Sequence, residues 1–183
     1  AWTDGASRFV LSGVEDIGGG LKGIFQIDTR YRVDNGTGGT PGGNTWVGLS
    51  GGFGAVKFGN IDTVYYQGTD QYSARSTALT AWNVGIISYI NQTALARTTR
   101  AQNTLRYETP NFSGLTAALS YSTNPDGAEP LTTGTKGQSV AAEVNYAAGP
   151  LSAGLAVWQQ KKPGGSGATA ATADQSEIRL FGG

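Results

Sequence analysis

Apolar and polar residues alternate along most of this chain, which predicts β-strands whose two faces differ in character. In residues 21–33, the odd positions are mainly apolar and the even positions mainly polar. The same alternation recurs before and after this run. It predicts about nine strands, at residues 7–16, 21–33, 45–50, 55–59, 103–108, 115–122, 139–146, 151–158 and from 177 onward.

The connections between these strands are of two kinds. Tight turns rich in glycine or proline are expected at residues 16–20, 51–54, 110–114 and 148–150, and longer polar loops at 34–44, 124–137 and 162–174. One end of the sheet then has short connections and the other has long ones. A soluble β-sandwich shows the same alternation, but this asymmetry favours an outer-membrane barrel, with short periplasmic turns and long outer loops.

One connection, Asp62–Asn103, is much longer than the rest. It contains five charged residues, several aromatic residues and a small apolar run at Val84–Ile90. Loops of more than about 12–15 residues are uncommon in compact domains unless they have a function. We therefore expect a structured loop that is held by the β-framework.

The composition excludes several function classes. The chain has no His, Cys or Met, and 13 basic residues balance 13 acidic ones. Zero net charge argues against strong binding to nucleic acid, and the missing His and Cys remove the usual zinc ligands and nucleophile–base pairs. We expect no cofactor and no metal. Charged residues make up only 14% of the chain, against about 25% in soluble domains, which suits a β-rich protein in an unusual solvent.

Three segments resemble hairpins of the Gram-negative general porins, in the branch found in β-proteobacteria. They are Ser7–Lys22, Val47–Gly59 and Asn103–Leu115. The resemblance implies an all-β fold: a transmembrane antiparallel barrel of sixteen strands, assembled as a homotrimer in the outer membrane of a Gram-negative bacterium. It also implies a water-filled lumen for passive diffusion of small hydrophilic solutes and ions.

Members of that family are nearly twice as long as this chain. We therefore expect residues 1–183 to be part of a single barrel, lacking the first strand and the later ones. The resemblance further implies that residues 62–103 match the loop that folds into the barrel and narrows its pore.

Distance from the short turns gives the depth of a residue along the barrel, because strands rise about 3.3 Å per residue. On the polar face, Arg8, Asp28 and Arg30 lie near mid-height, where the resemblance implies a constriction. It assigns Arg8 and Arg100 to a cationic cluster, with carboxylates facing them from the long loop. The predicted lumen and constriction residues are Arg8, Asp28, Arg30, Asp62, Asp70, Arg100 and Arg106.

Two lysines, Lys22 and Lys57, lie nearer the short turns and are expected at the periplasmic mouth. Related porins can carry arginines where this chain has Gly43 and Asn44, so strong anion selectivity is not expected from that segment. On the opposite face, aromatic side chains are expected to contact lipid. They are Phe25, Tyr31, Phe58, Tyr107, Tyr121 and Tyr146.

Two other interpretations stay open at this level. A secreted or surface β-sandwich, acting as a binding or adhesion module, predicts a complete and closed fold within these residues. A β-rich glycosidase would need two carboxylates at a fixed separation. Its candidates are Asp28, Glu108 and Glu143, although nothing in their spacing selects a pair; we expect no catalytic residues and no enzyme.

Overall fold

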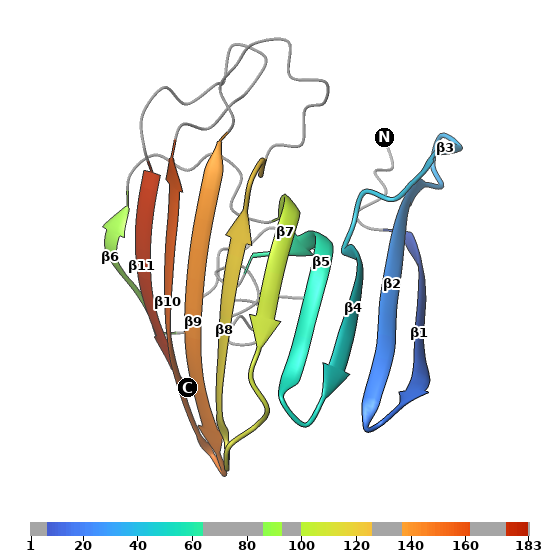
Figure 1. Ribbon diagram of the computed structural model, residues 1–183. Helices are drawn as coiled ribbons and strands as arrows, with labels where there is room; N and C mark the ends of the chain where they lie inside the picture. Colours follow the sequence, from blue (N-terminus) through green and yellow to red (C-terminus); the bar gives the residue numbers. More distant parts are fainter. Residues whose placement is uncertain (1–6, 64–85, 93–99, 126–136, 162–174, 183) are drawn as a thin grey trace.

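The computed structural model describes residues 7–63, 86–92, 100–125, 137–161 and 175–182 (Figure 1). The strands within these ranges form a single antiparallel sheet. Their bounds are β1 Arg8–Gly18, β2 Leu21–Arg32, β3 Thr37–Thr40, β4 Thr45–Gly51, β5 Gly54–Asp62, β6 Ile86–Gln92, β7 Arg100–Glu108, β8 Leu115–Ser122, β9 Gln138–Ala148, β10 Leu151–Lys161 and β11 Gln175–Gly182.

Nine of these eleven strands are the ones that the alternation predicts. The other two, β3 and β6, lie in segments expected to be loops. The order along the sheet is β1-β2-β4-β5-β7-β8-β9-β10-β11-β6, and β3 pairs with β2 beside this path. The expected all-β antiparallel fold is confirmed, and the β-sandwich alternative is wrong, because one continuous sheet replaces two packed ones.

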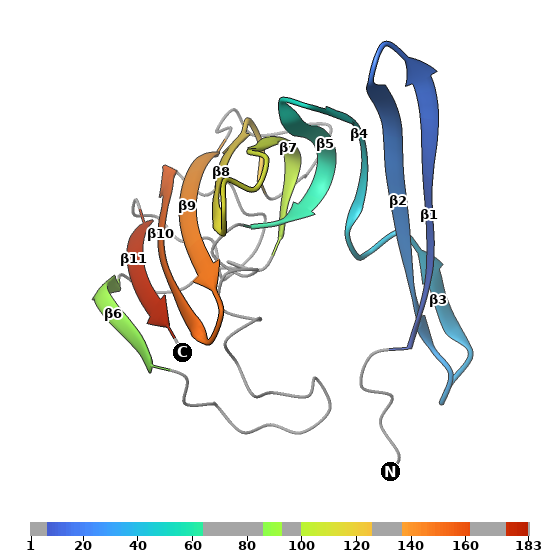
Figure 2. The same cartoon turned by 90° about the horizontal axis from the view of Figure 1, so that it is seen from below.

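The sheet follows an open arc, with β1 at one end and β6 at the other (Figure 2). Tight turns join β1 to β2, β4 to β5 and β9 to β10 at the same end of the strands (Figure 1). The arc and the common turn end are the geometry of part of a barrel wall.

Two strands extend further than the sequence predicted, because a bulge interrupts the alternation. The pairing of β5 with β7 shifts register between Gly59 and Ile61 and then continues to Asp62 and Arg100. Gly59 has φ of 151°, and a Cβ there would lie 2.3 Å from the carbonyl oxygen of Thr45. Glycine therefore permits the bulge, and Asp62 and Arg100 lie in paired strands rather than in the long connection.

The long connection contributes β6 to the far edge of the sheet. The backbone of β6 pairs antiparallel with β11, from Glu177 opposite Gln92 to Gly182 opposite Ile86. Among the described strands, β6 therefore stands last in the order, next to β11.

In a soluble protein the apolar face of a sheet is buried and the polar face is exposed, and here the two faces are the opposite way round. The large apolar side chains of one face are exposed, including Phe9, Leu11, Val47, Leu49, Leu105, Leu119, Val144 and Leu155. Side chains of the other face are buried although many are polar, including Asp28, Thr104, Arg106, Ser120, Ser139 and Glu143. Side chains converge on the concave side of a curved sheet, so we assign the polar, buried face to the inside of the arc.

Among the residues that the structure describes, no helix is long and apolar enough to cross a membrane.

Candidate functional site

The inner face carries two groups of charged side chains at different heights. We call Arg8, Asp28, Arg30, Asp62 and Arg100 the upper cluster, because these residues lie far from the short turns. Lys57, Arg106 and Glu108 form the lower cluster, near the short turns. Ion pairs hold the side chains of each cluster together.

A single carboxylate joins two arginines in the upper cluster. Asp28 Oδ2 lies 2.8 Å from Arg30 Nη2 and 3.6 Å from Arg8 Nη1. The register places Arg8 of β1 opposite Arg30 of β2, so both guanidinium groups start from the same level of the sheet. Asp28 is 1% exposed, and a buried carboxylate needs such partners to offset its desolvation.

The segment before β4 closes over Asp28. The Gly43 N–H donates to the Asp28 carbonyl oxygen at 3.0 Å, and the Asp28 N–H donates to Thr45 Oγ1 at 3.2 Å. A Cβ at Gly43 would lie 2.1 Å from the Asp28 carboxyl group. Only glycine leaves room for that carboxylate, which explains the residue at this position in physical terms.

A second ion pair completes the upper cluster. Arg100 Nε lies 2.7 Å from Asp62 Oδ1, across the β5–β7 pairing. Asn44 holds the same aspartate twice: its Nδ2 donates to Asp62 Oδ2 at 2.5 Å, and its Oδ1 accepts from the Asp62 N–H at 2.6 Å. Arg30 and Asp28 also interact electrostatically with Asp62, so the two parts of the cluster are neighbours.

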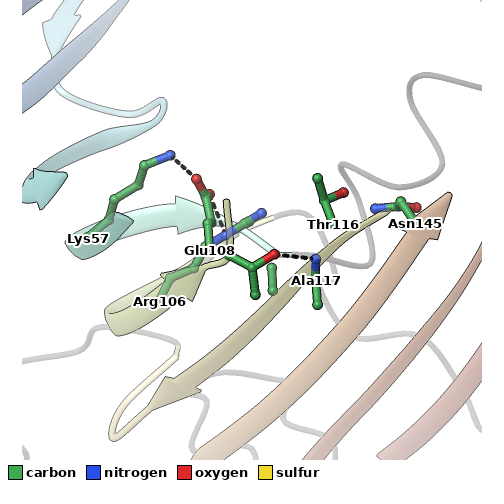
Figure 3. A pocket seen from close by; sticks show the side chains of 8 residues that line it. Lys57, Arg106, Glu108, Thr116, Ala117 and Asn145 are labelled. Carbon is green, nitrogen blue, oxygen red and sulfur yellow. Dashed lines mark hydrogen bonds and ion pairs between the residues drawn. The ribbon is translucent and has the colours of Figure 1, made fainter. Parts of the chain in front are cut away.

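The lower cluster repeats the arrangement of one carboxylate between two cations (Figure 3). Glu108 Oε2 accepts from Lys57 Nζ at 2.7 Å, and Glu108 Oε1 lies 2.8 Å from Arg106 Nε. Lys57 also lies over the ring of Trp46, with Nζ 4.8 Å from its centroid. Arg106 Nη1 donates to the Asp62 carbonyl oxygen at 3.1 Å, which joins the lower cluster to the upper one.

A cavity of about 400 Å³ opens beside the lower cluster. Its wall includes Lys57, Arg106, Glu108, Thr116 and Asn145, whose side chains stand on the same side of the sheet (Figure 3). Within the described ranges, no group of three or more acidic side chains is placed to hold a metal ion.

The structure brings together most of the residues predicted from the sequence. Arg8, Asp28, Arg30, Asp62 and Arg100 form one cluster on the inner face, as the positions of a constriction would require. Asp70 lies outside the described residues. The roles of all six residues in conduction stay predictions.

The remaining predicted positions fall on the expected faces. Lys57 and Arg106 are on the inner face beside Glu108, and Lys22 is paired with Asp16 and Ser50 close to a short turn. The six aromatic residues predicted to meet lipid are all exposed on the outer face: Phe25, Tyr31, Phe58, Tyr107, Tyr121 and Tyr146. Their contact with lipid stays a prediction.

Sequence reasoning missed the residues that hold the charges in place. Asn44 was noted only as a departure from arginine, and Glu108 only as a candidate acid of a glycosidase. The three glycosidase candidates do not gather at one point, because Asp28 and Glu108 belong to different clusters and each is paired with two cations. No spacing in the sequence signals the Asn44–Asp62 contact, because it depends on how the segment before β4 folds inward.

An apolar outer surface, a curved antiparallel sheet and an inner wall of paired charges define a class of protein. They describe a membrane β-barrel with a polar lumen, since lipid requires an apolar exterior and an aqueous lumen requires polar groups.

The chain belongs to the Gram-negative porin family, whose family model matches residues 1–182. It is 36% identical over 188 aligned positions to outer membrane porin protein 32 of Delftia acidovorans, covering 97% of this chain and 51% of that protein. It is 26% identical to the major outer membrane protein P.IB of Neisseria lactamica, covering 78% of this chain and 39% of that protein.

A solved structure gives the same result for the fold. The anion-selective porin from Comamonas acidovorans superposes with a TM-score of 0.75 at 30% identity, covering 97% of this chain and 53% of that one. The chain therefore spans about half the length of the relatives it matches. The expected family, its β-proteobacterial relatives and a location in the bacterial outer membrane are confirmed.

Proposed function

We propose that the protein forms a water-filled channel in the outer membrane, through which small hydrophilic solutes and ions diffuse passively. The observation that carries this proposal is the inner face: charged side chains are gathered there, and the opposite face of the same strands is apolar and exposed. No bond is made or broken in this function. Membership of the porin family supports it.

Selectivity would come from pore width and from the field of the charges on the wall. Five cationic side chains and three carboxylates make up the two clusters, and Glu143 on the same face adds a fourth carboxylate, which leaves one positive charge in excess. This excess supports a moderate preference for anions. A solved relative is described as anion-selective, which agrees in direction.

The complete assembly is part of the same proposal. We infer that the connection between Asp62 and Arg100, with Asp70, narrows the lumen opposite Arg8 and Arg100, while Asp62 pairs with Arg100 in the wall. We further infer that three identical barrels associate in the membrane, with lipid against the exposed aromatic side chains of the outer face. The family resemblance supports both inferences.

Planar-bilayer recording of the complete purified protein tests the proposal. It should give stepwise, ohmic conductance, and a salt gradient should give a reversal potential of the sign for anion preference. Heated and unheated samples in detergent gels should differ in mobility, with the unheated form near three subunits. A protein that leaves bilayer conductance unchanged would refute the channel, and a cation-directed potential would refute the selectivity.

A further inference from the structure

We propose that the cavity beside the lower cluster is a binding site for small dipolar solutes, with the chemistry of a dipeptide zwitterion. This site is distinct from the upper cluster, and the inference rests on the channel function proposed above. It assigns the carboxylate of the solute to the Lys57 side and its ammonium group to the side of Glu143 and Asn145.

The register defines the floor of this cavity. Glu108 of β7, Ala118 of β8 and Glu143 of β9 stand opposite one another in a single row across three neighbouring strands. Ala118 lines the cavity, and its small side chain leaves a gap between the two glutamates. Two strand spacings separate the glutamate backbones by about 9–10 Å.

One side of the gap carries excess positive charge. Glu108 is held by both Lys57 and Arg106, so two cations meet one carboxylate. A lysine ammonium has three N–H donors, and one of those of Lys57 is engaged by Glu108. Donors therefore remain for a solute carboxylate at the edge of the cavity that Lys57 lines.

The other side carries excess acceptors. Asn145 lines the cavity, and Glu143 beside it, which is not part of the cavity wall, is 5% exposed and accepts at Oε1 from Asn145 Nδ2. Glu143 Oε2 and Asn145 Oδ1 are buried without a hydrogen-bond donor in the structure as described. Buried acceptors are usually hydrogen-bonded to a donor, and a carboxylate forms its strongest hydrogen bonds with a cationic donor. The ammonium group of a solute supplies it.

The charge balance selects a dipolar solute over a simple ion. Counted in their usual ionised forms at pH 7, Lys57, Arg106, Glu108 and Glu143 sum to zero. Glu143 also interacts electrostatically with Arg106 and Glu108. A net anion satisfies only the Lys57 side, and a net cation only the Glu143 side.

The size of the gap indicates the length of the solute. Two residues in extended form span at most about 7 Å, and the backbones of Glu108 and Glu143 lie about 9–10 Å apart. The cavity, at about 400 Å³, falls within the usual range of about 300–1,000 Å³ for small-molecule sites. A dipeptide bridges the two poles, whereas the charges of a single amino acid lie too close together.

Titration of three probes into the complete detergent-solubilised protein tests the site by calorimetry. The probes are glycylglycine, its C-terminal amide, which lacks the carboxylate, and N-acetylglycylglycine, which lacks the ammonium group. Since a hydrogen bond to a charged group is a strong one, removing either pole should weaken binding about tenfold. The same probes should reduce single-channel current in the same order.

Three variants locate the site. Ala118→Leu fills the floor and should abolish glycylglycine binding, and Glu143→Gln should weaken it about tenfold while leaving the acetylated probe unchanged. Ala142→Leu is the matched control, because Ala142 lies opposite Leu119 on the outer face of the same strand as Glu143. Unheated gel mobility and wild-type-like conductance confirm that each variant has assembled.

The outcomes separate the two proposals. Equal binding of glycylglycine and its acetylated form, or unchanged binding in both Ala118→Leu and Glu143→Gln, would overturn the dipolar site and leave the channel intact. Equal binding of the amide would also overturn it. Calorimetric binding without any channel conductance would instead overturn the proposed function.

Discussion

Glu108→Gln should shift the channel further toward anions, because this glutamate opposes two cations at once. The substitution keeps the shape of the side chain and removes one negative charge that lies 2.7 Å from Lys57 Nζ and 2.8 Å from Arg106 Nε. Both cations then face the lumen with no carboxylate between them. The net charge of the lower cluster rises from one positive charge to two.

The size of the shift follows from Coulomb's law. One unit charge acting on a permeating ion about 6 Å away in water contributes about 0.7 kcal/mol, and salt at 0.1 M reduces this to about 0.4 kcal/mol. An anion gains this energy and a cation loses it. The anion-to-cation permeability ratio should therefore rise roughly threefold to tenfold.

Reversal potentials measured in planar bilayers under a tenfold salt gradient give this ratio directly. The matched control is Glu15→Gln, the same chemical change at a residue that pairs with Gly23 on the outer face near a short turn. Folding should be preserved, because the glutamine amide oxygen can still accept from Arg106 and the buried guanidinium keeps its hydrogen bond to the Asp62 carbonyl oxygen. A ratio that rises no more in Glu108→Gln than in Glu15→Gln, or that falls, would refute the assignment of Glu108 to the lumen.

Three further variants test other parts of the wall. Gly43→Ala forces the Asp28 carboxyl group away from a Cβ that would lie 2.1 Å from it; unfolding in urea should show a loss of about 1–3 kcal/mol, together with a changed reversal potential. Asn44→Ala removes both hydrogen bonds to Asp62 and should cost about 1–3 kcal/mol in the same assay, whereas an unchanged midpoint would contradict the anchoring role. Leu105→Lys places a charge on the exposed apolar face and should destabilise insertion by about 2–4 kcal/mol at the membrane midplane, with Leu105→Met as the neutral control; equal yields of folded protein from both variants in lipid vesicles would contradict a lipid-facing position.

The period-2 alternation predicted the fold because it fixes which side chains share a face. Leu105 and Tyr121 stand opposite each other on the outer face, and Arg106 and Ser120 on the inner face. A shift of one residue in register would reverse all of these positions at once. The strands and their faces were therefore accessible from the sequence, and the structure confirms them.

The ends of the strands and the short additional strands were not accessible in this way. The bulge at Gly59 breaks the alternation, which concealed that β5 continues to Asp62 and that β7 begins at Arg100. The β3 strand consists of Thr37–Thr40 with two central glycines, a composition with no apolar face to detect. Pairing of β6 with β11 joins segments far apart in the chain, and no local pattern specifies such a partner.

The candidate site shows the same division between local and long-range information. The distance of Arg8, Asp28 and Arg30 from their turn was enough to predict that they lie at a similar height, because a tight turn fixes the register of the two strands that it joins. The anchoring of Asp62 by Asn44 was not predictable, because it links residues 18 positions apart through an inward-folded segment. Predictions held where one hairpin decides the geometry and failed where a loop decides it.

The carboxylates of the inner wall limit the excess of positive charge that its arginines and lysine produce. Asp28 and Glu108 each bridge two cations, and with the Asp62–Arg100 pair neutral, each cluster keeps one positive charge in excess. Exchanging an arginine for lysine would leave that excess unchanged, whereas neutralising a bridging carboxylate doubles it. Asp28 is 1% exposed, and an amide in its place would bury N–H donors against the Arg30 guanidinium, which is itself a donor, whereas Glu108 is 27% exposed. Selectivity is therefore open to change at Glu108, while the same change at Asp28 would put the fold itself at risk.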